Sequence, residues 1–331
     1  PSAITYVCCL KACGILQAID KGREIHGEVE RQCLPERNMV VGNALVDMYI
    51  KCGLREKAHC VFDNLQTRDV VTWTSLISGY ADHEYGEEAL DYFGKMQKEG
   101  VYPNMVTFVC VLKACGCIGA LVRGKEIHQE IRRKGLLEKD IMIGTALIDM
   151  YAKCGEIAKA KEVFNELRVQ DVVSWNALIA GYAQLGEEKV VFTLFSAMIK
   201  EGVNPNVVTF SSILNSCSHS GLLDECQVYF DIMSIMYDIM PTLEHYTCMI
   251  DLYCRTGHLE NAVSVLKDMP FSADRTLWHA LMGASQKWGN MKVGRLAFDN
   301  LMRLNKDDAV AYISMCNIYV TSGMEEDADM I

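Results

Sequence analysis

The sequence has no hydrophobic run that approaches the roughly 18–20 residues a membrane-spanning helix requires, although half of its 331 residues are hydrophobic. It also has no sustained two-residue alternation of apolar and polar residues, so we expect essentially no β-sheet. Positive charge is scarce, since 32 Lys and Arg face 43 Asp and Glu and the net charge is −11. Such a chain is a poor candidate for nonspecific nucleic-acid binding, and any such binding must depend on a local surface.

Common catalytic and metal-binding motifs are missing as well. The sequence contains no Walker loop, no Gly-x-Ser-x-Gly, no His-Glu-x-x-His and no Cys-x-x-Cys. His-x-Glu occurs at His26, His128 and His258, but the Pro-Cys-x-x-Cys that completes a zinc deaminase site is absent. We therefore expect no catalytic residue, metal or cofactor. The fifteen scattered cysteines favour reduced thiols in a cytosolic or organellar matrix compartment.

The chain does have an internal repeat with a spacing of 102 residues. The segment NALVDMYIKCG at 43–53 returns as TALIDMYAKCG at 145–155, and VVTW at 70–73 returns as VVSW at 172–175. A fixed period of this kind predicts a solenoid, in which each unit buries its apolar face against its neighbours. His26 and His128 also lie 102 residues apart, so they are one feature of the repeat that occurs twice.

The long period subdivides into units of about 36, 31 and 35 residues. In 172–206, Leu178, Ile179 and Tyr182 indicate the apolar face of a first helix, and Gly202 and Pro205 end a second helix. Each unit therefore predicts a helical hairpin, and the fold class we expect is an all-α solenoid. The units are 3–38, 39–69, 70–104, 105–140, 141–171, 172–206, 207–242 and 243–274, with weaker units at 275–308 and 309–331.

Several segments carry a resemblance: VVSWNALIAGYA (172–183), GTALIDMYAKCGEIAKAKEVF (144–164) and KACGCIGALVRGKEIH (113–128). They resemble the P, S and L motifs of plant pentatricopeptide repeat proteins of the PLS subclass. The resemblance implies L units at 3–38, 105–140 and 207–242, S units at 39–69, 141–171 and 243–274, and P units at 70–104 and 172–206. The segments 276–290 and 311–323 are similar to the E motifs that follow such arrays, which implies E motifs over 275–331 with the second one truncated.

The family resemblance implies an array that binds single-stranded RNA with one base per repeat. The fifth residue of a unit then faces the base, and these positions hold Val7, Asn43, Thr74, Val109, Thr145, Asn176, Ser211 and Thr247. The last residue assists, and these positions hold Asn38, Asp69, Asn104, Asp140, Asp171, Asn206, Thr242 and Asp274. Short amides, hydroxyls and carboxylates suit the reading of base edges, but Ser, Thr, Asn and Asp are also preferred helix N-caps.

The resemblance also implies a base clamp at the second residue of each unit and phosphate contacts in the S units. The clamp residues are Ile4, Val40, Val71, Val106, Met142, Val173 and Val208, and Glu244 departs from this pattern. Core packing is the alternative explanation for these aliphatic residues. The phosphate-facing residues are Lys51, Lys153 and Arg255, for which a solvated helix end is the alternative. We expect the dense basic run Arg132–Lys134 to lie on an outer face instead.

The family code implies the target 5′-N-U-A-N-G-Y-N-G-3′, in which the L units leave their bases undefined. The E motifs imply selection of a C-to-U editing site in organellar transcripts, with a cytidine deaminase domain following in the chain or recruited as a partner. A mitochondrial or plastid location is expected, with any transit peptide outside this sequence, and neither DNA nor membrane is an expected partner. The alternatives are an RNA stabilisation or processing factor without editing and a helical protein–protein scaffold.

Overall fold

The structure, a computed structural model, describes residues 1–34, 38–137, 140–321 and 323–324. Within these ranges the regular secondary structure is helical and no strand occurs, which confirms the predicted all-α solenoid. The chain divides into two compact units, 1–170 and 171–331. The end of segment 309–331, which includes part of the second expected E motif, lies outside the described residues.

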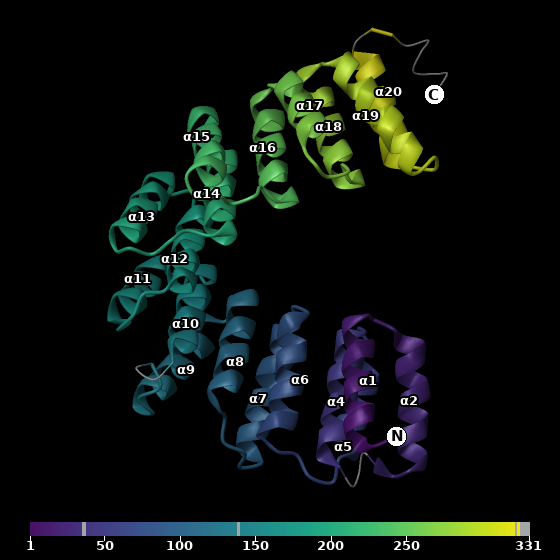
Figure 1. Cartoon of the computed structure of the whole chain (residues 1–331), viewed down its shortest axis with the longest axis vertical. Helices are drawn as coiled ribbons and strands as arrows, with labels where there is room; N and C mark the ends of the chain where they lie inside the picture. The colour runs from purple at the N-terminus through teal and green to yellow at the C-terminus, as the bar shows by residue number, and fades with distance from the viewer. Residues whose placement is uncertain (35–37, 138–139, 322, 325–331) are drawn as a thin grey trace. The chain divides into compact units, whose positions relative to one another are not determined.

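Unit 1–170 is built from five helix pairs in two layers (Figure 1). The first helices of the pairs are α1 (Ala3–Ile15), α4 (Met39–Lys51), α6 (Val70–Asp82), α8 (Met105–Cys117) and α10 (Ile141–Lys153). The second helices are α2 (Ile19–Arg31), α5 (Arg55–Asn64), α7 (Gly86–Lys98), α9 (Leu121–Arg133) and α11 (Ile157–Glu166). Each first helix contacts the first helix of the next pair, so the first helices form a continuous row.

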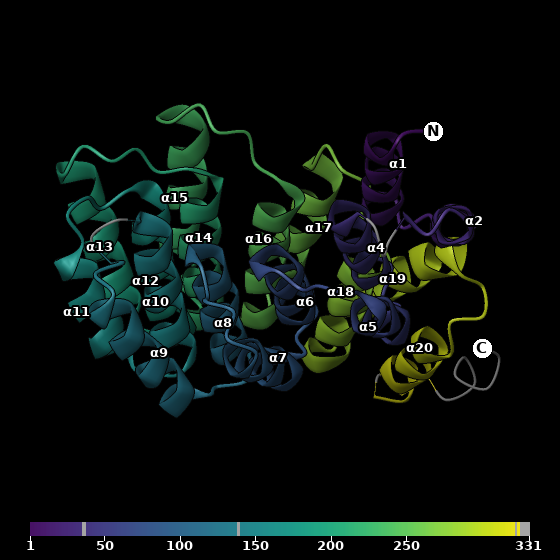
Figure 2. The ribbon, with the colours of Figure 1, turned by 90° about the horizontal axis from the view of Figure 1, so that it is seen from below.

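The described part of unit 171–331 has the same kind of arrangement, with four pairs and one further helix. Its first helices are α12 (Val172–Gln184), α14 (Val207–Ser220), α16 (Leu243–Thr256), α18 (Arg275–Trp288) and α20 (Ala309–Thr321). Its second helices are α13 (Glu188–Lys200), α15 (Leu223–Ile235), α17 (Leu259–Asp268) and α19 (Met291–Leu304). Figure 2 shows α18 and α19 next to each other, and α20 contacts both of them.

The core lies between the two layers and is supplied by residues at three- and four-residue steps. In α6, Trp73, Leu76 and Ile77 are almost completely buried, as are Phe93 and Met96 in the partner helix α7. This spacing places the side chains on one face of each helix, where they exclude water together. Hydrophobic burial between neighbouring pairs is therefore what holds the array together.

Glycine ends several of the helices, and Gly257 shows why the residue is needed. It is the C-cap of α16 with a φ of +83°, a left-handed conformation that other residues adopt at a cost. A Cβ atom on Gly257 would also lie 3.1 Å from the ring of Trp288. The Trp288 indole donates a hydrogen bond to the carbonyl of Cys254 at 2.9 Å, so this close packing joins α16 to the end of α18.

None of the helices in the described ranges combines the length and the apolar character needed to cross a bilayer.

Candidate nucleic-acid interface

The last residue of each expected repeat caps the first helix of the next one. The caps have extended backbone, and in seven of them a side-chain oxygen accepts a hydrogen bond from a backbone N–H two or three residues later: Asn38, Asp69, Asn104, Asp140, Asp171, Asn206 and Asp274. At Thr242 the backbone N–H instead donates to Nδ1 of His245 at 3.0 Å. The N-cap explanation of these residues therefore holds, and it leaves further lone pairs and amide protons for a ligand.

In one repeat the fifth and last residues are joined directly. The Asn176 amide Nδ2 donates to Oδ1 of Asn206 at 3.0 Å, and the Asn176 Oδ1 accepts from the Thr209 hydroxyl at 2.6 Å. Asn176 is buried, and it belongs to α12, whereas Thr209 is the third residue of α14. The predicted reading pair of 172–206 thus forms one hydrogen-bonded ring with a residue of the following repeat.

Two other fifth residues are connected to the last residue of their repeat through the third residue of the following repeat. Thr74 and Thr107 hydroxyl oxygens are 2.7 Å apart, and Thr107 donates to Oδ1 of Asn104 at 2.9 Å. In the other case, the fifth residue is Ser211, the third residue of the following repeat is His245, and the last residue is Thr242. The Ser211 hydroxyl lies 3.2 Å from Nε2 of His245, whose Nδ1 lies 3.0 Å from the Thr242 hydroxyl.

The remaining fifth residues behave differently. Thr145 and Thr247 each donate their hydroxyl proton to the carbonyl four residues earlier, at 3.1 and 2.8 Å, so only lone pairs remain for a ligand. The Asn43 Oδ1 is buried and has no hydrogen-bond partner among the described residues. Val7 and Val109 are half-buried and offer no polar group.

The second residues of the repeats are exposed. Ile4, Val40, Val71, Val106, Met142, Val173 and Val208 have between 52% and 76% of their side-chain area open to solvent. Core packing therefore does not account for these aliphatic residues. Each follows an N-cap by two positions, so within each unit they form an exposed apolar series along one end of the row of first helices. Glu244 is exposed at the same position of α16.

The three residues expected to contact phosphate are exposed, and each is paired with an aspartate one turn earlier. Lys51 lies 2.8 Å from Asp47, Lys153 lies 2.8 Å from Asp149, and Arg255 lies 2.7 Å from Asp251. The helices α4, α10 and α16 therefore end in solvated ion pairs. Exposed pairs of this kind contribute about 0–1 kcal/mol to stability, so the cations are held loosely.

The side chains of Lys51 and Lys153 pass close to a glycine in the preceding first helix, which has no Cβ atom in their way. The sequence analysis did not identify these glycines. A Cβ atom on Gly116 in α8 would lie 3.2 Å from Cδ of Lys153, and Gly14 has the same relation to Lys51. The signal was present, because KACG recurs at 11–14 and 113–116.

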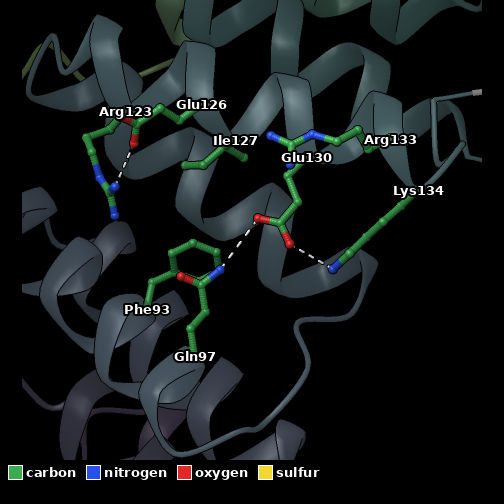
Figure 3. A pocket seen from close by; sticks show the side chains of 8 residues that line it. All are labelled: Phe93, Gln97, Arg123, Glu126, Ile127, Glu130, Arg133 and Lys134. Atoms are coloured by element: carbon green, nitrogen blue, oxygen red, sulfur yellow. Dashed lines mark hydrogen bonds and ion pairs between the residues drawn. The ribbon is translucent and has the colours of Figure 1, made fainter.

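The basic run Arg132–Lys134 belongs to the layer of second helices. Arg132 pairs with Glu166 at 2.6 Å, and Lys134 pairs with Glu130 at 2.8 Å. Figure 3 shows Lys134 and Glu130 beside a cavity of about 420 Å³ between α7 and α9. Neighbouring carboxylates partly neutralise this basic run.

The repeated histidines are packing residues of the second helices α2 and α9. His26 Nδ1 lies 2.7 Å from the Tyr49 hydroxyl, and His128 Nδ1 lies 2.8 Å from the Tyr151 hydroxyl. Burial lowers the pKa of His128 to about 4 and lowers that of His26 as well. The described part of the chain contains no cluster of three or more His, Cys, Asp or Glu residues that could hold a metal ion.

In the unit 275–308 the two residues at the positions that would read a base contact each other directly. Its fifth residue, His279, and its last residue, Asp308, meet with 2.8 Å between Nε2 and Oδ2, and Arg275 reaches the same oxygen at 2.8 Å. The hydrogen bond from Arg275 is the main cause that lowers the pKa of Asp308 to about 2. The sequence reading missed this cluster, although its residues occupy the fifth and last positions of the unit.

Comparison with known proteins identifies the family. The family model described as PPR repeat family matches residues 68–117 and 170–219, and models described as PPR repeat match 145–172, 208–235 and 237–270. Together these matches cover more than half of the chain. The chain belongs to the pentatricopeptide repeat family.

Relatives in Arabidopsis thaliana match this pentatricopeptide repeat chain over nearly its whole length. One pentatricopeptide repeat-containing protein is 38% identical over 334 residues, which are 100% of this chain and 59% of the relative. A relative named mitochondrial is 34% identical over 98% of this chain and 47% of its own length. One named chloroplastic is 38% identical over 98% of this chain and 44% of its own length. The chain thus spans about half the length of these relatives.

Solved structures show the same fold. The crystal structure of the pentatricopeptide repeat protein PPR10 from maize matches with a TM-score of 0.68 and 18% identity, covering 99% of this chain and 53% of that chain. PPR10 in complex with an 18-nt psaJ RNA element matches with a TM-score of 0.67 and 18% identity, covering 94% of this chain and 46% of that chain.

Proposed function

We propose that the protein binds single-stranded RNA in a sequence-specific manner, with one base per repeat. The observation that carries this proposal is the joining of fifth and last residues in hydrogen-bonded groups, of which Asn176 with Asn206 is the most direct. These groups lie at the same end of the first helices as the exposed aliphatic second residues. Polar groups held in fixed geometry beside exposed apolar side chains suit a base, which has a hydrogen-bonding edge and an apolar face.

The proposed target is 5′-N-U-A-N-G-Y-N-G-3′. The N-terminal repeat binds the base at the 5′ end, and each later repeat binds the next base toward the 3′ end. U pairs with Asn43 and Asp69, and A pairs with Thr74 and Asn104. The first G pairs with Thr145 and Asp171. The pyrimidine pairs with Asn176 and Asn206, and the second G pairs with Thr247 and Asp274. The bases at Val7 with Asn38, Val109 with Asp140, and Ser211 with Thr242 are undefined.

The hydrogen bonds of the two proposed G-reading threonines support this assignment. Thr145 and Thr247 use their hydroxyl protons within their own helices, so each presents only lone pairs. The carboxylates of Asp171 and Asp274 are also acceptors only. The Watson–Crick edge of guanine offers N–H donors at N1 and N2, which such acceptors can bind. The hydrogen-bonding capacity of these two repeats therefore complements guanine.

Two further elements complete the proposed interface. The exposed aliphatic second residues provide surfaces on which base faces can pack, and the ends of α4, α10 and α16 provide Lys51, Lys153 and Arg255 for phosphates. PPR10, whose fold this chain shares, was solved in complex with an 18-nt RNA element, which supports RNA as the ligand class.

We further propose that the bound RNA is an organellar transcript and that binding selects a cytidine for C-to-U editing. The resemblance of 275–331 to E motifs supports this role, and relatives named mitochondrial and chloroplastic support an organellar location. Catalysis would come from a cytidine deaminase domain in the longer protein or from a partner protein recruited through the E motifs. The direct contact between His279 and Asp308 agrees with a unit used for such protein contacts instead of base reading.

The test is a binding titration with 5′-N-U-A-N-G-Y-N-G-3′ RNA and a scrambled RNA of the same composition. We expect clear preference for the proposed target, because each good base contact discriminates by about 1–3 kcal/mol. Equal and weak binding of both RNAs would contradict the proposal and favour a protein–protein scaffold. Specific binding without editing in an organellar extract that contains the deaminase would favour a stabilisation or processing factor.

A reciprocal substitution makes this test specific to one repeat. Asn176→Thr would place a threonine beside Thr209 and Asn206, which reproduces the arrangement of Thr74 with Thr107 and Asn104. The preference at the sixth base should shift from pyrimidine to A, and Thr74→Asn should shift the third base from A to pyrimidine. An unchanged preference in both variants, measured on RNAs that differ at one base, would refute the assigned register.

A further inference from the structure

The hydroxyl of Thr209 is completely buried and forms a ring with two asparagines. The backbone N–H of Asn206 donates to the Thr209 hydroxyl oxygen at 3.0 Å, and the backbone N–H of Thr209 donates to Oδ1 of Asn206 at 3.1 Å. Backbone N–H groups can only donate, so these two bonds fix the hydroxyl oxygen and the Asn206 Oδ1 as acceptors.

The remaining two bonds of the ring then have only one direction. Because Oδ1 of Asn206 is an acceptor, Asn176 must present its Nδ2 donor at 3.0 Å. The Asn176 Oδ1 therefore faces Thr209 and accepts its proton at 2.6 Å. A carboxamide has nearly the same shape in both orientations, but the two orientations exchange donor and acceptor. Asn206 and Thr209 together thus determine which hydrogen-bonding groups Asn176 presents to a base, and the Thr209 hydroxyl makes the shorter of its two side-chain contacts, 2.6 against 3.2 Å, with Asn176.

The same third position carries out this role with a different side chain in the next unit. His245 is completely buried, and its Nδ1 accepts from the Thr242 backbone N–H at 3.0 Å. Its Nε2 lies 3.1 Å from the Val207 carbonyl, which can only accept, so Nε2 carries the proton. Ser211 lies 3.2 Å from this Nε2–H and can accept from it, which leaves the Ser211 hydroxyl proton for a ligand.

Not every third residue makes this contact, and a polar fifth residue can be followed by an apolar third residue, as Thr247 is by Leu277. Thr72 is as buried as Thr209 but donates only to Asp69, at 2.9 Å, and forms no bond to the fifth residue Asn43. After the apolar fifth residues Val7 and Val109, the third residues of the following helices are the apolar Val41 and Ile143. A polar third residue bonded to the fifth residue is therefore a property of particular repeats.

We propose that the third residue of the following repeat is a positioning residue for base reading, and that Thr107, Thr209 and His245 have this role. The inference rests on the proposed RNA-binding function. Each of these residues holds the fifth residue of the preceding repeat in one hydrogen-bonding orientation. The base preference of these three repeats is consequently set by three side chains each, of which the third belongs to the next helix.

The test compares Thr209→Val with Thr209→Ser and with the matched control Thr72→Val. Binding is measured with four RNAs that differ only at the sixth base, and with four that differ only at the second base. Thr209→Val should reduce discrimination at the sixth base by about 2- to 10-fold, the equivalent of one lost hydrogen bond. Thr209→Ser keeps the hydroxyl and should keep the discrimination. Thr72→Val should leave discrimination at the second base unchanged, although it also removes a buried hydroxyl from a cap.

A purely structural role would lower the thermal midpoint and the affinity for all RNAs without changing base discrimination. Unchanged discrimination in folded Thr209→Val would therefore overturn the inference while the proposed function stands. Absence of base preference in the unmodified protein would overturn the proposed function and this inference with it. If Thr209→Val does not fold, Thr107→Val provides the same test at the third base, and retained preference for A there would overturn the inference.

Discussion

The buried His128 gives the stability of the protein a defined dependence on pH. Burial keeps its pKa near 4 in the folded protein, against an ordinary value of 6.5. Between these values the unfolded chain binds a proton that the folded chain does not, so the free energy of unfolding falls as the pH drops from about 6.5 to about 4. The expected loss is roughly 2–3 kcal/mol from this residue, and His26 contributes in the same direction.

Denaturant unfolding of the wild type and of His128→Phe at pH 7 and pH 4.5 measures this effect. The variant should be less stable at pH 7, because the bond to Tyr151 is lost, and its stability should depend less on pH. The exposed His59 offers a control, and His59→Gln should retain the wild-type pH dependence. An identical pH dependence in His128→Phe would show that other groups cause the loss.

At single positions the sequence predicts which residues stand at the candidate site better than it predicts what they touch. The register of the repeat places Asn176 and Asn206 correctly at helix position and cap, because both positions recur. The contact of Asn176 with Thr209 crosses from one repeat to the next, and the spacing of residues within a repeat contains no information on it. The contact of His279 with Asp308 is likewise not predictable from spacing, since it depends on how α18 packs against the start of α20.

At the scale of the helix, α10 combines a cap, an exposed aliphatic residue and an ion pair in one element. Lys153 at its end is held 2.8 Å from Asp149, which offsets its charge. Asp149→Asn should therefore strengthen RNA binding by about 2- to 5-fold at low salt, because two unit charges about 4 Å apart in water interact by about 1 kcal/mol. Titration of the proposed target at low ionic strength measures this change.

The control for this prediction lies in the other layer. Asp91 and Lys95 form the same type of pair at 2.8 Å in the second helix α7. Asp91→Asn changes the net charge by the same amount, but it lies away from the ends of the first helices and should leave the affinity nearly unchanged. Equal strengthening by both variants would indicate a general charge effect and would argue against a phosphate contact at Lys153.

The helices themselves were the most predictable part of the fold. The first helices start after Ser, Asn, Asp or Thr caps, and several of them end at glycines such as Gly257, so local chemistry identifies these boundaries. The exposure of Val71 and Val173 was not predictable, because an aliphatic residue in a helix is compatible with either the core or the surface until the neighbouring helices are placed.

At the scale of the whole molecule, the net charge of −11 means that RNA binding must depend on a few local cations. Three cations are proposed to contact phosphate, so the logarithm of the binding constant should fall with the logarithm of salt concentration with a slope of about −2 for a single strand. Titrations between low and physiological salt measure this slope. A slope near −5 would mean that the RNA follows other basic residues, and the basic run Arg132–Lys134 would then need to be tested.

The ring formed by Asn176, Asn206 and Thr209 has a consequence for exchanging repeats between proteins of this kind. A module cut at the boundary between Asn206 and Val207 would carry the two asparagines but not Thr209, and the recipient would supply its own third residue in the next helix. If the recipient has an apolar residue there, the transplanted asparagine loses the partner that orients it. The segment that determines base preference therefore includes the first three residues of the next helix. Modules cut after Thr209 should retain their base preference in a recipient better than modules cut after Asn206.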